Sequence, residues 1–157
     1  ARPRQIWIKT KLYGAHPDSL HRIGRQLTAF AAVHNLKQEE GKALNLIASA
    51  FTNKGDLDSS EHYLLRSAHV FETLHDDHNL SVTLNNLGNT ASSRGDLAQA
   101  IEYLTRGLKI TEALGESSGM ARVLGNIGVM YHMQADYVNA MDYYQRRLGI
   151  AAALGDQ

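Results

Sequence analysis

The chain of 157 residues carries 16 basic and 16 acidic side chains and contains no cysteine. A formal charge of zero provides no electrostatic signature for binding DNA or RNA, and a chain without cysteine forms no disulfide and no thiolate metal site. The sequence also lacks an apolar run of the roughly 20 residues that a membrane-spanning helix needs. We therefore expect a cytoplasmic protein with no nucleic-acid or membrane partner.

A similar pattern of residues returns every 40 positions, for example in the series Leu44, Leu84 and Leu124. A fixed period of this size is typical of repeat arrays, in which each unit packs only against its neighbours. The first unit is degenerate, and the last is three residues short of a full period. We interpret residues 1–157 as a single repeat domain with units at 1–40, 41–80, 81–120 and 121–157.

Helical periodicity is clear from Pro17 onward, because apolar residues recur three and four positions apart. Pro17 suits the first position of a helix, and no proline follows it. Residues 1–14 leave three alternatives open: an additional, frayed helix, an extended arm or a remnant of a longer protein. The pattern predicts a helix that begins at Pro17 and six more near residues 38–54, 57–74, 78–94, 97–114, 118–134 and 137–154.

The turn inside each unit has its own sequence signature. Glycine ends the first helix without a steric penalty in the left-handed region, at Gly55 and Gly95. An aspartate follows, whose carboxylate accepts the free amide hydrogens of the next helix. In the last unit Ala135 replaces the glycine. That turn either holds a left-handed alanine, at a cost on the order of 1 kcal/mol, or has a different shape.

Small residues recur at fixed positions, where they allow two helix backbones to approach closely. They are Ala48, Gly88 and Gly128 on the first helix of each pair and Ser60, Ala100 and Ala140 on the second. Gly107 lies in mid-helix, where glycine is costly, and we interpret it as a tight contact between units.

The chain resembles the tetratricopeptide repeats. The resemblance is carried by Leu84, Leu87-Gly88, Gly95-Asp96, Ala100 and Tyr103-Leu104, and one unit later by Leu124, Ile127-Gly128, Tyr131, Asp136-Tyr137, Ala140 and Tyr143-Tyr144. The 40-residue period is similar to that of LGN/Pins-type scaffolds, kinesin light chains and bacterial multidomain regulators. The resemblance implies an all-α, right-handed superhelical stack of antiparallel helix hairpins, whose first helices line a concave surface.

Asparagines are frequent on these first helices, and a carboxamide can donate to and accept from a peptide backbone at once. The resemblance adds that peptide-binding members hold carboxylates with asparagine and a basic residue, although no complete basic clamp is present here. The alternative is that these asparagines tie helices together or are merely hydrated. The candidate groove residues are Asn45, Asn85, Asn86, Asn89, Arg122 and Asn126.

Other combinations of reactive side chains give weaker evidence of a functional site. The stretch 75–78, His-Asp-Asp-His, has the composition of a metal site, but it lies in a predicted turn with no second ligand group nearby. A nucleophile elbow and a glycine-rich phosphate loop are both missing from the sequence. We therefore expect no metal, no cofactor and no enzymatic activity.

The last predicted helix has an apolar face with no following helix to cover it, formed by Tyr137, Met141, Tyr144, Leu148, Ile150, Ala151 and Leu154. Repeat arrays usually end in a polar cap, so either the chain is part of a longer protein or this helix self-associates. We expect a protein–protein interaction scaffold that binds a partner peptide or protein on its concave face. The alternative is a sensory or oligomerising segment of a larger signalling or transcriptional regulator.

Overall fold

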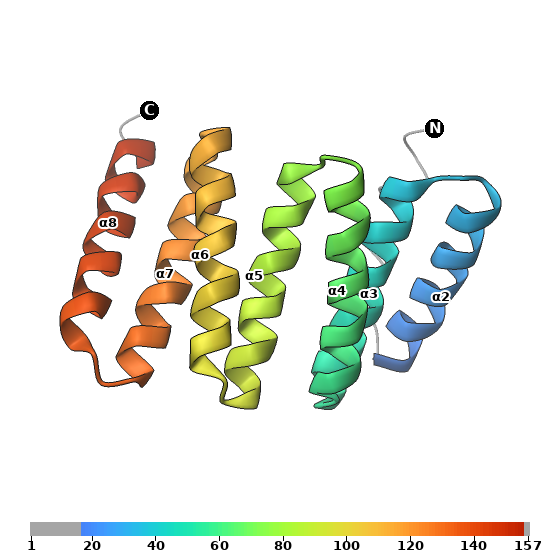
Figure 1. The fold of residues 1–157 in the computed structure, drawn as a ribbon, viewed down its shortest axis with the longest axis horizontal. Coiled ribbons are helices and arrows are strands. Elements are labelled where there is room, and N and C mark those ends of the chain that lie inside the picture. Colours follow the sequence, from blue (N-terminus) through green and yellow to red (C-terminus); the bar gives the residue numbers. More distant parts are fainter. Residues whose placement is uncertain (1–16, 156–157) are drawn as a thin grey trace.

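The computed structural model describes residues 17–155, which form a stack of antiparallel helix hairpins. The helices follow one another along the long axis of the molecule, so α2 and α8 lie at opposite ends of the stack (Figure 1). The described helices are α2 (Pro17–Val33), α3 (Lys37–Lys54), α4 (Leu57–Thr73), α5 (Asp77–Arg94), α6 (Leu97–Leu114), α7 (Ser117–Met133) and α8 (Tyr137–Gly155).

The predicted all-α fold is confirmed, and the bounds of the predicted helices agree with the structure to within one residue. The described residues contain no strand. The alternatives left open for residues 1–14 lie outside the described part of the chain. Within residues 17–155, none of the helices combines the length and the hydropathy of a membrane span.

The predicted hairpin turns have the expected geometry. Gly55 and Gly95 adopt φ values of 78° and 91°, and the carboxylates of Asp56 and Asp96 accept hydrogen bonds from the backbone N–H groups three residues on. Ala135 adopts φ 59° and donates to the His132 carbonyl oxygen at 3.0 Å, as Gly55 donates to the Thr52 carbonyl oxygen. The first of the two alternatives for this turn is therefore correct: the alanine is left-handed, and the turn keeps its shape.

Each hydrophobic cluster joins one hairpin to the first helix of the next hairpin. One cluster contains buried residues of α3, α4 and α5, centred on Phe71 and Leu84. The other contains buried residues of α5, α6 and α7, centred on Leu104 and Ile127. Burial of these side chains supplies the main force for stacking, since each contributes about 1.5–3 kcal/mol relative to exposure.

The first helices of successive hairpins lie closer together than the second helices. The backbones of α3 and α5, and of α5 and α7, approach each other closely, whereas those of α4 and α6, and of α6 and α8, make no comparable approach in the described residues. The stack therefore curves toward α3, α5 and α7. We call the surface formed by these three helices the inner face.

Glycine is required within the hairpins where the backbones approach most closely. A Cβ atom on Gly88 would lie 2.6 Å from Leu104 Cγ, and one on Gly128 would lie 2.5 Å from Tyr144 Cε1. Gly107 differs, because its nearest neighbours, on Leu84 and Ser81, would be 3.6 Å away. The interpretation of Gly107 as a tight contact between units is wrong: its neighbours belong to the same hairpin, and the spacing is ordinary van der Waals contact.

Two glycine substitutions should therefore change stability in opposite directions. We expect Gly88→Ala to lower the free energy of unfolding by about 1–3 kcal/mol, because the steric conflict with Leu104 outweighs the better helix propensity. We expect Gly107→Ala to raise it by about 0.5–1 kcal/mol, because a methyl group fits there. Urea unfolding followed by circular dichroism measures both values, and changes of the same sign would contradict this account.

Candidate binding site on the inner face

Three of the six candidates, Asn45, Asn85 and Asn126, form the main hydrogen bonds between neighbouring first helices. Asn45 Nδ2 donates to Thr83 Oγ1 at 2.9 Å and joins α3 to α5. Asn126 Nδ2 donates to Asn85 Oδ1 at 2.8 Å and, more weakly, to Asn89 Oδ1 at 3.4 Å, joining α7 to α5. The Asn85 side chain was expected at the surface, but this expectation is wrong, because the residue is only 6% exposed.

Both interfaces use the same asparagine position on the earlier helix but pair it with different residues on the next helix. Asn45 and Asn85 are 40 residues apart, and the next position in that series is Gly125. A Cβ atom on Gly125 would lie 3.1 Å from Cδ and Nη1 of Arg147, so the arginine stem occupies the space of a side chain. The partner of Asn45 is Thr83, whereas Val123 takes the place of Thr83 one repeat later and Asn126 is the partner of Asn85.

Asn86, Asn89 and Arg122 keep polar groups available for a partner. Asn86 is half-buried, and its carboxamide forms no hydrogen bond to any described residue. Asn89 is exposed, and its Oδ1 accepts from Asn126 while its Nδ2 remains unpaired within residues 17–155. Arg122 is exposed and forms no ion pair in the same part of the chain. The structure therefore divides the six candidates into an interface set and a free set.

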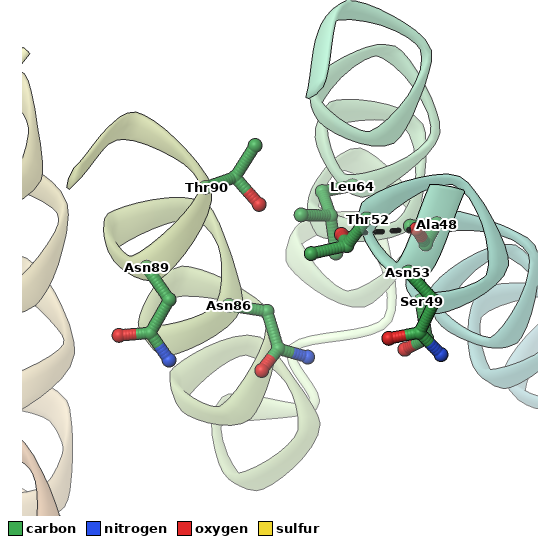
Figure 2. A pocket seen from close by; sticks show the side chains of 8 residues that line it. All are labelled: Ala48, Ser49, Thr52, Asn53, Leu64, Asn86, Asn89 and Thr90. Carbon is green, nitrogen blue, oxygen red and sulfur yellow. Dashed lines mark hydrogen bonds between the residues drawn. The ribbon is translucent and has the colours of Figure 1, made fainter. Parts of the chain in front are cut away.

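A cavity of about 160 Å³ opens between α3 and α5 on the inner face (Figure 2). Its floor is apolar and consists of Ala48 and Leu64, both of which are buried. Its polar lining is formed by Ser49, Thr52, Asn53, Asn86, Asn89 and Thr90. Of these six residues, Asn86 and Asn89 are among the candidates from the sequence, whereas the other four, including Asn53, are not. Asn53 could have been found, because it lies one helical turn beyond Ser49.

The free surface of α7 is partly apolar. Val129 and Met133 are exposed on this helix at 42% and 55%, one helical turn apart. Met133 lies close to α5, where the Ser92 hydroxyl approaches its sulfur at 4.0 Å. The inner face thus presents amides over α3 and α5, and a cation and two apolar side chains over α7.

Within residues 75–78, the side chains of Asp76 and His78 are engaged in structural contacts. The Asp76 carboxylate caps α5 by accepting from the Asn79 backbone N–H at 3.1 Å, and it also accepts from Gln38 Nε2 at 2.7 Å. Burial raises the pKa of Asp76, but the hydrogen bonds from Gln38 and Asn79 outweigh it and hold the pKa below its usual value. His78 Nδ1 lies 2.6 Å from Glu116 Oε1. The described residues contain no group of three metal-ligating side chains.

Part of the apolar face predicted on the last helix is exposed, whereas its members Tyr144 and Ile150 are half-buried. Val138 and Leu148 are 83% and 67% exposed, and Tyr137 and Met141 are exposed as well. The two occupants expected for this face, a further repeat or a second copy of the chain, stay predictions.

The division of the asparagines predicts different effects on stability. We expect Asn126→Ala to lower the free energy of unfolding by about 1–3 kcal/mol, because it leaves the buried Asn85 oxygen without a donor. We expect Asn86→Ala to change it by less than about 0.5 kcal/mol. Thermal and urea unfolding of both variants test this, and equal losses of stability would show that the division is wrong.

The chain matches the family described as tetratricopeptide repeat at residues 39–113 and again at residues 123–157, which are 75 and 35 residues, or 110 of 157. No curated protein matches the sequence.

Several solved structures share the fold. The chain is 21% identical to BtubC from P. vanneervenii, with a TM-score of 0.81, and the match covers 90% of this chain and 59% of BtubC. It is 17% identical to a Rap protein complexed with competence and sporulation factor, with a TM-score of 0.79, and the match covers 84% of this chain and 37% of the Rap protein. It is 20% identical to the repeat domain of Arabidopsis FLU, with a TM-score of 0.69 and coverage of 77% and 99%. The chain thus spans less than two thirds of the first two proteins.

Proposed function

The chain belongs to the tetratricopeptide repeat family, and we propose that it is a protein-interaction scaffold that binds a segment of a partner protein on its inner face. The observation that carries this proposal is the set of unpaired polar groups on Asn86, Asn89 and Arg122, together with the exposed Val129 and Met133. Because an extended segment presents backbone donors, acceptors and apolar side chains together, it complements such a surface.

The six asparagine and arginine candidates then have two kinds of role. Asn45, Asn85 and Asn126 set the spacing and rotation of the first helices, because their amides are engaged across the helix interfaces. Asn86, Asn89 and Arg122 contact the bound segment. This assigns a binding rather than a catalytic role to the chain and places its specificity in residues that folding does not use.

A sensory segment of a larger regulator is the second candidate function. One of the similar structures is a Rap protein complexed with competence and sporulation factor, and this chain spans 37% of that protein. At 17% identity this likeness concerns the fold alone. A role in signalling, in the cytoplasm, would use the same inner face, with ligand binding communicated to other domains.

The inner-face proposal can be tested by selecting binders from a random-peptide library on the purified chain. We expect the selected peptides to lose about tenfold or more in affinity for a variant that combines Asn86→Ala, Asn89→Ala and Arg122→Ala, because three sets of hydrogen bonds are removed. Fluorescence anisotropy measures the dissociation constants.

A matched control combines Lys109→Ala with Gln145→Ala, two exposed residues on second helices, and should leave binding unchanged. Circular dichroism establishes that both variants keep their helix content. Peptides that bind the inner-face variant as tightly as the unmodified chain would contradict the proposal.

A further inference from the structure

The cavity between α3 and α5 has a polar lining that carries no charge. Its six polar residues are hydroxyl and carboxamide side chains, and no acidic or basic residue lines it. Lys54, which follows Asn53 in the sequence, forms an ion pair with Asp18. Arg122 lies on α7 and does not line the cavity. A charged group entering this cavity would therefore lose hydration without gaining a counter-ion from the lining, which is costly.

The lining hydroxyls are largely engaged with the protein itself. Ser49 Oγ donates to the Asn45 carbonyl oxygen at 3.1 Å. Thr52 Oγ1 lies 3.2 Å from the Ala48 carbonyl oxygen and 2.7 Å from Ser60 Oγ. Because each hydroxyl has only one hydrogen to donate, these groups have little donor capacity left for a ligand.

Two of the three lining carboxamides, by contrast, are not engaged with the protein. Asn53 and Asn86 form no side-chain hydrogen bond to any residue in the range 17–155, so each offers both a donor and an acceptor. Figure 2 shows the Asn86 carboxamide pointing from α5 toward α3, the helix that carries Ser49 and Asn53. A ligand group between these helices thus meets donors and acceptors from both sides, above the apolar floor of Ala48 and Leu64.

We propose that this cavity binds one primary carboxamide, supplied by a glutamine or asparagine side chain of the partner segment. The inference rests on the proposed function, since it names the anchor side chain of a segment bound to the inner face. A carboxamide donates to the oxygens of Asn53 and Asn86 and accepts from their nitrogens, whereas its methylene groups lie on the apolar floor. A carboxylate of the same shape can only accept, and an apolar side chain leaves both asparagines unpaired.

The decisive comparison is between isosteric peptides. Peptides selected on the purified chain should contain a glutamine or asparagine whose replacement by the matching acid weakens binding by about tenfold or more. Replacement of that glutamine by methionine should weaken binding to a similar extent. Isothermal titration calorimetry at moderate and at high salt separates this effect from long-range repulsion, which salt screens.

Asn53→Ala identifies the cavity as the origin of the preference. Asn53 is exposed and is not one of the residues in the inner-face variant described above, so its substitution should leave the melting temperature unchanged. We expect this variant to lose most of the discrimination between glutamine and glutamate. Asn139→Ala is not a suitable control, because the Asn139 side chain donates to the Asp136 carboxylate at the start of α8. Gln145→Ala is a suitable control and should keep the discrimination between glutamine and glutamate.

The outcomes distinguish this inference from the proposed function. If peptides depend on Asn86, Asn89 and Arg122 but bind equally well with glutamate in place of glutamine, the carboxamide anchor is wrong and the inner-face site stands. If discrimination persists in Asn53→Ala, the anchor does not lie in this cavity and the inference is overturned. Peptides that bind the inner-face variant as tightly as the unmodified chain would overturn both the proposed function and this inference. A failure to select any peptide would do the same.

Discussion

The hydrogen bond from Asn126 to Asn85 is the interaction on which the inner face depends. It spans the interface between α5 and α7, and its acceptor residue is almost fully buried. A buried amide oxygen left without a donor costs about 1–3 kcal/mol, so this bond favours one rotation of α7 about its axis. Asn45 and Thr83 form the corresponding bond between α3 and α5. Together these bonds determine which side chains of the first helices remain free.

The exposed ion pairs between repeats have a smaller role. Arg106 pairs with Glu72 and Arg146 with Glu112, so an equivalent ion pair recurs one repeat later between second helices. Pairs of this kind, which are largely exposed, contribute about 0–1 kcal/mol each. The apolar clusters that join each hairpin to the next supply most of the stacking energy. The asparagine bonds instead fix how the first helices are rotated relative to one another on the inner face.

Sequence alone predicted the helices to within a residue, because glycine or aspartate marks many of the helix ends and apolar spacing marks the helices between them. It also identified a surface rich in amides. It could not separate Asn85 from Asn86, because adjacent residues on a helix differ by about 100° in direction and only the packing against α7 decides which one is buried. It also could not identify the partner of Asn85, because Val123 takes the place of Thr83 one repeat later and Asn126 forms the bond instead.

The central claim is that folding uses the amides of Asn85 and Asn126, whereas the amides of Asn53 and Asn86 are left for a ligand. The most direct measurement is nuclear magnetic resonance of the asparagine side-chain amide groups during titration with a selected glutamine-containing peptide. The account predicts large shifts for the Asn53 and Asn86 carboxamides and little change for those of Asn85 and Asn126. Large shifts confined to Asn85 and Asn126, with Asn53 and Asn86 unaffected, would contradict it.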